Sequence, residues 1–308
     1  MKIIFFGTPY FAKEILKFLI EKKINIIAVV TQNDKILGKR KYVSEVKKYI
    51  VDNNIHIPIF QPEKAKDESF IENLKKMDAD LFVVVAYGQI LTQKLLDLPK
   101  KGCINTHASI LPKYRGANPI RYAILNGEKT TGVTIMKMVK KMDAGDIILK
   151  DVIEIHKDDN FQTLESKLLK ITKPVLLKTL DLFKQNNVSY FSQDESLVTF
   201  APKLTIDDRL INLYKNPAEI INQIRALSPY PGAFIEIIVD NEIKQLKILH
   251  AVDDNKNLNF KEIFIDKENF IIGLQHKSLK LLEIQLEGKS KMNVKDFLTG
   301  LKKSIKIK

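Results

Sequence analysis

The sequence predicts an α/β protein with a mostly parallel sheet and flanking helices, followed by a small antiparallel β-barrel. Residues 2–6 are apolar, residues 10–21 carry apolar side chains at helical spacing, and residues 25–31 form a β-branched run. Residues 80–87 are almost continuously apolar, which is typical of a strand in the middle of a parallel sheet. From residue 233 onward, short apolar runs predict the strands of an antiparallel barrel.

Further elements follow in the order expected of such a sheet. Pro58 limits the extended piece around it to a sheet edge, because proline cannot donate a ladder hydrogen bond. Asn118 can cap a helix that has Pro119 at its first position. Pro174 is expected to kink or split a long amphipathic helix. These elements are helices at 67–76, 119–126 and 163–183, and strands at 57–60, 103–107, 131–138 and 147–155.

A change of pattern near residue 185 divides the chain. Asparagines, Gln193 and Pro202 there are typical of a connection, so we assign residues 189–205 to a linker. The first domain is then 1–188 and the second is 206–308. The second domain starts with a helix at 218–227 that Asn216 and Pro217 introduce, and the barrel strands follow.

Cysteine content and hydropathy indicate the compartment. Cys103 is the only cysteine of the 308 residues, which excludes a disulfide framework and a thiolate metal cluster. It could be a nucleophile, but a small buried side chain on a strand is the interpretation we favour. No apolar run approaches the length that spans a bilayer, and Lys13 and Glu14 interrupt the apolar start. We therefore expect a cytoplasmic protein with no membrane partner.

The net charge of +13 suits a phosphate-rich partner, although scattered lysines are often only a solvated surface. Part of the surplus lies in the polar segment 32–48, which we expect to be a flexible loop that contacts phosphate or leads into a surface helix. The last residues, LKKSIKIK, either add to a nucleic-acid surface or form a disordered tail. The candidate nucleic-acid contacts of the loop are Lys35, Lys39, Arg40 and Lys41.

Three polar side chains are candidates for catalysis. Asn105 and His107 are two residues apart on a predicted strand, so both side chains point to one face. Asp143 follows another strand, and Gly145 behind it can turn the chain so that the carboxylate points into the same cleft. An amide and an imidazole can hold an oxyanion, and a carboxylate can orient the imidazole and move protons, which suits acyl transfer to an amine. A structural histidine and a turn aspartate remain the simpler alternative.

Segments beside these residues have the composition of pocket loops. Residues 109–120 contain two prolines, a glycine and two bases, and Tyr87 and Gly88 lie at the carboxyl end of a predicted parallel strand, where such sheets bind ligands. A tight turn explains Gly88 equally well. No dinucleotide is expected, because Gly7-Thr-Pro is not the glycine-rich fingerprint. No metal is expected, since His56, His156, His250 and His276 lack partners at metal-ligand spacing and are taken as structural or surface residues.

Eight runs, spread over nearly the whole chain, are characteristic. They are IIFFGTPYFA at the start, VVTQND at 29–34, VVVAYGQIL at 83–91, INTHASILPKYRGANPI at 104–120, TGVTIMKM at 131–138, MDAGDI at 142–147, TFAPKL at 199–204 and IRALSPYPGAF at 224–234. Through these runs the chain resembles the formyltransferases that use 10-formyltetrahydrofolate, and among these the methionyl-tRNA formyltransferases. The Asn-x-His and Asp pattern is common to several formyltransferases, whereas the opening run and the later segments are similar to the tRNA enzymes.

The resemblance implies a Rossmann-like catalytic domain, an OB-like tRNA-binding barrel, and formyl transfer from 10-formyltetrahydrofolate to the α-amino group of methionyl initiator tRNA by a monomer in translation initiation. It implies catalysis by Asn105, His107 and Asp143. The resemblance also implies a basic loop with a key arginine that contacts the tRNA. In this sequence the core of the loop, Ile36-Leu-Gly-Lys-Arg-Lys41, differs from the family's, so either Lys39 or Arg40 corresponds to that arginine. Related enzymes formylate glycinamide ribonucleotide or a nucleotide sugar amine, or hydrolyse the formyl-folate. A non-catalytic tRNA-binding module is a further alternative. The implied folate contacts are Tyr87, Gly88, Ser109, Ile110, Leu111 and Pro112.

Overall fold

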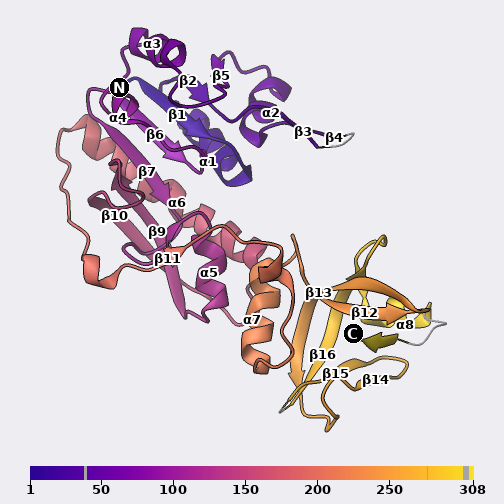
Figure 1. Cartoon of the computed structure of the whole chain (residues 1–308). Coiled ribbons are helices and arrows are strands. Elements are labelled where there is room, and N and C mark those ends of the chain that lie inside the picture. The colour runs from indigo at the N-terminus through magenta and orange to yellow at the C-terminus, as the bar shows by residue number, and fades with distance from the viewer. Residues whose placement is uncertain (38–39, 276, 301–304) are drawn as a thin grey trace. The chain divides into compact units, whose positions relative to one another are not determined.

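The computed structural model describes residues 1–37, 40–275, 277–300 and 305–308 (Figure 1). The chain divides into two compact units, and both are discontinuous in sequence. Residues 189–201, which the sequence analysis assigned to a linker, pack within the first unit. The first unit comprises Met1–Pro119, Thr131–Ile153 and Glu165–Ala201, and the second comprises Ile120–Thr130, Glu154–Leu164 and Pro202–Lys308.

A seven-stranded sheet forms the centre of the first unit, in the order β10-β9-β7-β6-β1-β2-β5. Neighbouring strands from β7 to β5 run parallel, and β9 runs antiparallel to β7. This confirms the predicted Rossmann-like, mostly parallel sheet. The strands are β1 (Ile3–Gly7), β2 (Ile26–Val30), β5 (Ile59–Phe60), β6 (Leu81–Val85), β7 (Cys103–His107), β9 (Thr130–Lys137) and β10 (Ile147–Glu154).

Burial along the strands explains their order. Every residue of β1 and β6 is buried, as expected where helices cover both faces of a parallel sheet. The strand β5 is only two residues long and lies at the edge, directly after Pro58, as predicted. The strand β6 pairs in parallel with β7, so its carboxyl end lies beside the end of β7, which carries the candidate residues.

The predicted helices at 10–21, 67–76, 119–126 and 163–183 are present, and the structure adds the short α4 and, after the basic segment, α2. Ser44 caps α2 by accepting a hydrogen bond from the Lys47 amide. Pro174 neither ends nor splits α6, because buried leucines such as Leu168 and Leu176 hold both halves of the helix in place. The helices are α1 (Tyr10–Glu21), α2 (Glu45–Asp52), α3 (Glu68–Lys76), α4 (Gln93–Leu96), α5 (Pro119–Leu125) and α6 (Phe161–Lys184).

The basic segment at 32–48 differs from the expected flexible loop. It contains two short antiparallel strands, β3 (Lys35–Leu37) and β4 (Arg40–Tyr42), before α2 begins. Two more short strands, β8 (Arg115–Gly116) and β11 (Phe200–Ala201), pair in parallel and join residues 189–201 to the loop after β7. The 3₁₀ turn Glu195–Leu197 lies just before β11.

The second unit contains the predicted antiparallel barrel and a helix. Its strands follow the order β14-β15-β16-β13-β12-β18, and β17 pairs with β16. The helix α7 (Pro217–Leu227) begins with a capping box between Asn216 and Glu219. The other elements are a 3₁₀ turn at Asp207–Arg209, β12 (Ala233–Val239), β13 (Glu242–Asp254), β14 (Ile263–Ile265), β15 (Phe270–Gly273), β16 (Ser278–Leu286), β17 (Met292–Asn293), α8 (Val294–Thr299) and β18 (Ile305–Ile307).

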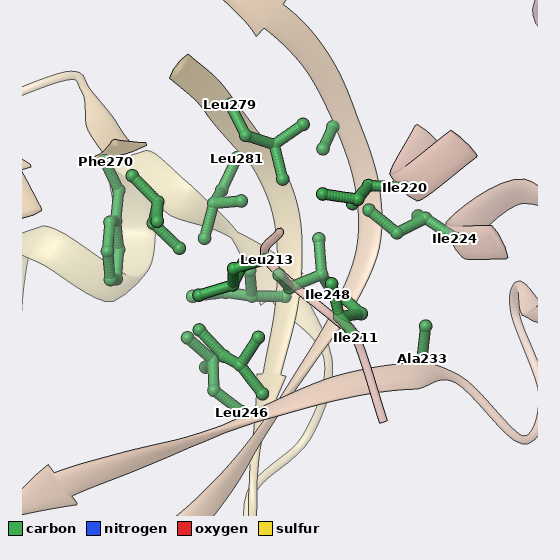
Figure 2. Packing of buried hydrophobic residues seen from close by; sticks show 14 of the residues in the cluster. Ile211, Leu213, Ile220, Ile224, Ala233, Leu246, Ile248, Phe270, Leu279 and Leu281 are labelled. Atoms are coloured by element: carbon green, nitrogen blue, oxygen red, sulfur yellow. The ribbon is translucent and has the colours of Figure 1, made fainter. Parts of the chain in front are cut away.

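Alternating side chains of the barrel strands form its core (Figure 2). Leu246 and Ile248 of β13 and Leu279 and Leu281 of β16 are almost completely buried, and Ile220 of α7 packs against the same cluster. The chain end pairs with β12 through β18, so Ile305–Ile307 are ordered in the barrel and are not part of a disordered tail. His276 and residues 301–304 lie outside the described residues.

Candidate active site

Strand β7 brings the first two candidate side chains together. Asn105 pairs with Met136 of β9, and His107 pairs with Thr134, so both residues project from the same face of the sheet. Asn105 is partly buried, and His107 is 5% exposed. The carboxyl end of β7 therefore presents an amide and an imidazole side by side, as the sequence predicts.

The loop after β9 supplies the carboxylate. Asp143 Oδ1 lies 3.4 Å from Asn105 Nδ2, and Asp143 Oδ2 lies 3.7 Å from His107 Nδ1. The Gly116 amide donates a 2.8 Å hydrogen bond to Asp143 Oδ2. Asp143 has a φ of 47°, a left-handed conformation that residues other than glycine seldom adopt. The three predicted catalytic residues thus form one cluster, in which a strained backbone aims the carboxylate.

Hydrogen bonding fixes the orientation of the imidazole. His107 Nε2 lies 2.8 Å from the Tyr114 carbonyl oxygen, which can only accept, so Nε2 donates. Nδ1 then faces the Asp143 carboxylate, and a proton on Nδ1 would be attracted to it. Both ring nitrogens are therefore directed at protein groups. Within the described part of the chain, Asn105 keeps one amide N–H that can be directed at a substrate oxygen.

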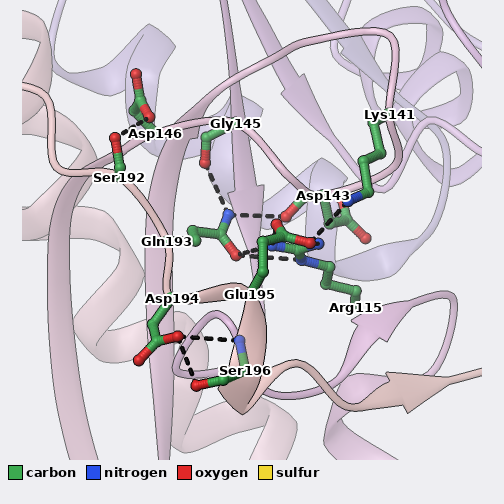
Figure 3. Close-up of polar contacts among 10 residues, drawn as sticks. All are labelled: Arg115, Lys141, Asp143, Gly145, Asp146, Ser192, Gln193, Asp194, Glu195 and Ser196. Carbon is green, nitrogen blue, oxygen red and sulfur yellow. Dashed lines mark hydrogen bonds and ion pairs between the residues drawn. The ribbon is translucent and has the colours of Figure 1, made fainter.

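Residues from the predicted linker contact the loop that carries Asp143 (Figure 3). Gln193 Nε2 donates to the carbonyl oxygens of Asp143, at 2.8 Å, and Gly145, at 2.7 Å. Gln193 Oε1 accepts hydrogen bonds from Arg115, which is 1% exposed and also pairs with Glu195. A buried guanidinium is thus compensated beside the catalytic loop.

The predicted folate residues lie at the carboxyl ends of β6 and β7, but their side chains differ in access. Tyr87 is 1% exposed and packs edge-on against Phe6 in the core, because its side chain faces the apolar layer. Burial raises the pKa of Tyr87 to about 12. Only the backbone of Tyr87 faces the strand ends, where its carbonyl accepts hydrogen bonds from Thr8 and Gln32.

Residues 109–112, which follow β7 after Ala108, belong to a folded turn. The Ser109 hydroxyl donates to the Lys113 carbonyl at 2.6 Å, and Leu111 is buried against Met136 and Ile147. Ile110 and Pro112 are half-buried, and Gly88 is exposed. Gly88, Ile110 and Pro112 therefore keep accessible surface, whereas the side chains of Tyr87, Ser109 and Leu111 are buried.

The predicted nucleic-acid contacts lie on the β3–β4 hairpin. Lys35 is exposed and pairs across the hairpin with Tyr42. Arg40 and Lys41 belong to β4. Lys39 lies outside the described residues. The exposed Ile36 and the half-exposed Tyr42 give the hairpin an apolar part as well as its charge.

Other candidate groups do not belong to the site. Cys103 is 2% exposed, and burial raises the pKa of its thiol, so it is not prepared to act as a thiolate. The side chain of His156 is exposed in a turn, as expected. Among residues 1–37, 40–275, 277–300 and 305–308, no three His, Cys, Asp or Glu side chains are grouped as metal ligands, and no helix is long and apolar enough to cross a membrane.

Comparison with known families decides the assignment. The family model described as "Formyl transferase" matches residues 1–180, and the model "Formyl transferase, C-terminal domain" matches residues 203–302. The chain belongs to the formyl transferase family. The resemblance stated from the sequence runs is thereby confirmed.

Relatives of this formyl transferase cover its full length. It is 41% identical over 306 residues to a methionyl-tRNA formyltransferase of Protochlamydia amoebophila, with 99% of this chain and 96% of the relative covered. It is also 41% identical to one of Staphylococcus epidermidis, with 99% and 97% covered. A crystal structure of WlaRD, a sugar 3N-formyl transferase in the presence of dTDP and 5-N-formyl-THF, has the same fold, with a TM-score of 0.66, 23% identity and 94% and 99% of the two chains covered.

The site of this formyl transferase also contains groups that the sequence pattern did not single out. The Tyr114 carbonyl and the Gly116 amide are backbone groups, and nothing in their residue types indicates a role. Arg115 is one of two bases in a loop with two prolines and one glycine, and its near-complete burial could not be read from the sequence. Gln193 lies 50 residues from Asp143, and no spacing links the two.

Proposed function

We propose that the chain transfers the formyl group of 10-formyltetrahydrofolate to the α-amino group of methionyl initiator tRNA. The observation that carries the chemistry is the cluster of Asn105, His107 and Asp143 at the end of β7. The full-length similarity to proteins named methionyl-tRNA formyltransferase supports the acceptor. A role in translation initiation would place the reaction in the cytoplasm, and we propose that the enzyme acts as a monomer.

The residues divide the chemistry between them. Bound folate supplies the formyl group, and the attacking amine forms the new C–N bond as the bond to the folate nitrogen breaks. Asn105 Nδ2 donates to the oxygen of the formyl group as that oxygen gains negative charge. His107 contributes positive charge beside it while Tyr114 holds the ring. Asp143 stabilises the charged ring and moves the proton from the amine toward the leaving nitrogen.

The predicted ligand segments fit this chemistry. Gly88, Ile110 and Pro112 present small or apolar surface at the strand ends, which suits the flat ring of a folate. Ser109 and Leu111 would support that surface, together with the backbone of Tyr87. We propose these segments as the folate site, with no metal in the reaction.

Charge supports an RNA acceptor. The net charge of +13 favours a polyphosphate, and Lys35, Lys39, Arg40 and Lys41 place several bases in one short segment. We propose that the β3–β4 hairpin contacts the tRNA backbone and that residues 206–308 bind the rest of the acceptor, while catalysis belongs to residues 1–188. A barrel with basic residues is a common platform for nucleic-acid backbones.

The test is formyl transfer from 10-formyltetrahydrofolate to charged initiator Met-tRNA, with glycinamide ribonucleotide, free methionine and a dTDP-linked amino sugar as parallel acceptors. Strong preference for the tRNA is expected. Transfer to a small acceptor alone would keep the chemistry and reject the RNA partner. Release of formate without any acceptor would reassign the chain to hydrolysis.

A further inference from the structure

Two residues between the two family matches contact the catalytic loop. Gln193 and Glu195 follow residues 1–180 and precede residues 203–302. Their side chains meet Arg115 and the backbone of the Asp143 loop (Figure 3). The segment that carries them is itself anchored, because the amide of Phe191 donates to the carbonyl of Ile147 at 2.9 Å and the reverse bond is 2.8 Å.

Arg115 holds Gln193 and Glu195 in place. Its Nε and Nη2 donate to Gln193 Oε1 at 3.1 and 2.8 Å, and Nη2 also pairs with Glu195 Oε1 at 2.7 Å. Lys141 Nζ lies 2.7 Å from Glu195 Oε2. Hydrogen bonds from Arg115 and Lys141 lower the pKa of Glu195 to about 2, so this carboxylate is ionised at neutral pH and balances the buried guanidinium.

The two sides of the Gln193 amide face different chemistry. Arg115 offers only donors, and the carbonyl oxygens of Asp143 and Gly145 offer only acceptors. The amide can satisfy both sides in one orientation alone, with its oxygen toward Arg115 and its nitrogen toward the loop. The two N–H groups then bind the carbonyls that flank Ala144, at 2.8 and 2.7 Å.

This arrangement matters because the loop is strained. Asp143 has a φ of 47°, and such conformations persist only where the surroundings fix them. Its carboxylate must stay within reach of Asn105, His107 and the Gly116 amide. The hydrogen bond from Gln193 to the Asp143 carbonyl restrains the backbone that orients this carboxylate. In the described structure, Gln193 has no hydrogen bond to Asn105, His107 or the Gly116 amide.

We propose that Gln193 is a positioning residue: it holds the Asp143 loop in its left-handed conformation and is itself oriented by Arg115. The proposal rests on the proposed function for its kinetic effect, but its structural effect can be measured without turnover. Gln193 would act on the formyl-transfer step through Asp143 and not on the binding of either substrate.

Two variants separate positioning from mere packing. Gln193→Glu keeps the size of the side chain and gives Arg115 another negative partner, but it points an oxygen at two carbonyl oxygens. Gln193→Met removes both donors without adding a charge. Each variant should lower kcat about 10- to 100-fold, because small misplacements of a catalytic group have effects of this size, while KM for both substrates stays unchanged. Ser196→Ala is the control, since among the described residues the Ser196 hydroxyl donates to Asp194 on the same segment and to no group of the Asp143 loop.

Hydrogen–deuterium exchange of peptides covering residues 139–147 provides the readout that needs no turnover. Faster exchange there in both Gln193 variants, with the rates of Ser196→Ala equal to those of the parent, supports the proposed positioning role of Gln193. Parent-like exchange and parent-like kcat in folded Gln193→Glu would overturn it, and so would a lowered melting temperature with kcat unchanged. If the parent chain formylates no Met-tRNA, the proposed function fails. The exchange rates still show whether Gln193 restrains the Asp143 loop.

Discussion

Replacing Asp143 by asparagine tests the central electrostatic interaction of the site. Asparagine keeps the shape of the side chain, and its oxygen can still accept the hydrogen bond from the Gly116 amide. The change removes the negative charge beside His107, and with it the second oxygen, which accepts from Asn105 Nδ2 at 3.4 Å. The change therefore separates the charge of Asp143 from its place in the loop.

The distance between the two groups sets the size of the effect. Asp143 Oδ2 and His107 Nδ1 are 3.7 Å apart, and both side chains are largely buried. With an effective dielectric constant of about 20, a full charge pair at this distance is worth about 4 kcal/mol. If the positive ring stabilises the transition state, the loss corresponds to a decrease of roughly 1000-fold in kcat.

The assay is single-turnover formyl transfer to Met-tRNA with folate in excess, so that product release does not mask the chemical step. Asp151→Asn is the matched control, because Asp151 is exposed on β10 and its side chain bonds to the neighbouring Val152 amide. The control should transfer formyl at the parent rate. An Asp143→Asn rate within about tenfold of the parent would refute the reasoning, since a charge at this distance could not then be acting on the transition state.

Four further outcomes are expected. Asn105→Ala should lower kcat about 100- to 1000-fold with little change in melting temperature; a parent-like rate would remove this amide from the oxyanion site. Gly116→Ala should lower the melting temperature, because the new methyl group would lie 2.6 Å from the Ala201 carbonyl oxygen at a φ of 124°; unchanged thermal unfolding would contradict this. Glu195→Gln should reduce the free energy of unfolding at neutral pH, measured by urea titration. The difference from the parent should disappear as pH falls from 4.5 toward 2, because the hydrogen bond from Arg115 is the main cause that lowers the folded-state pKa of Glu195 to about 2. A difference that does not change with pH would refute the ion pair. Added salt should weaken the binding of Met-tRNA measured by filter retention, and the logarithm of the binding constant should fall linearly with the logarithm of the salt concentration. A binding constant that does not change with salt would mean that the basic side chains only solvate the surface and do not contact phosphates.

Local periodicity predicted the part of the site that lies on one strand. Asn105 and His107 share a face because side chains alternate along β7, and this geometry depends on no distant residue. Asp143 could also be predicted from its place after a strand, but β9 runs antiparallel to β7 and ends beside Ile104. The loop after β9 must therefore return toward His107, and the turn at Asp143 and Gly145 allows this. The fold class followed from the same kind of information, namely buried strands such as β6 and alternating strands such as β13.

Three other features depend on contacts that periodicity does not contain. Proline costs a helix about 3 kcal/mol, but burial of several leucines on both sides of Pro174 outweighs that cost. The basic segment at 32–48 forms a hairpin whose cross-strand pairs join residues such as Ile36 and Lys41. The basic chain end is fixed by pairing with β12, which its lysine-rich composition does not indicate.

The polar residues 189–201 show why a linker and a structural support can have the same composition. A sequence of polar residues without periodicity predicts a solvated connection. Here those residues satisfy buried groups of another segment: Gln193 serves two carbonyls, and Glu195 balances Arg115. Buried polar groups must find such partners wherever the chain can supply them. Because backbone carbonyls exist at every position, no residue type near Asp143 reveals that its loop requires a donor from 50 residues away. The side chains proposed to perform the reaction can be found by their chemistry, whereas Gln193, which we propose aims one of them, can be found only from its contacts.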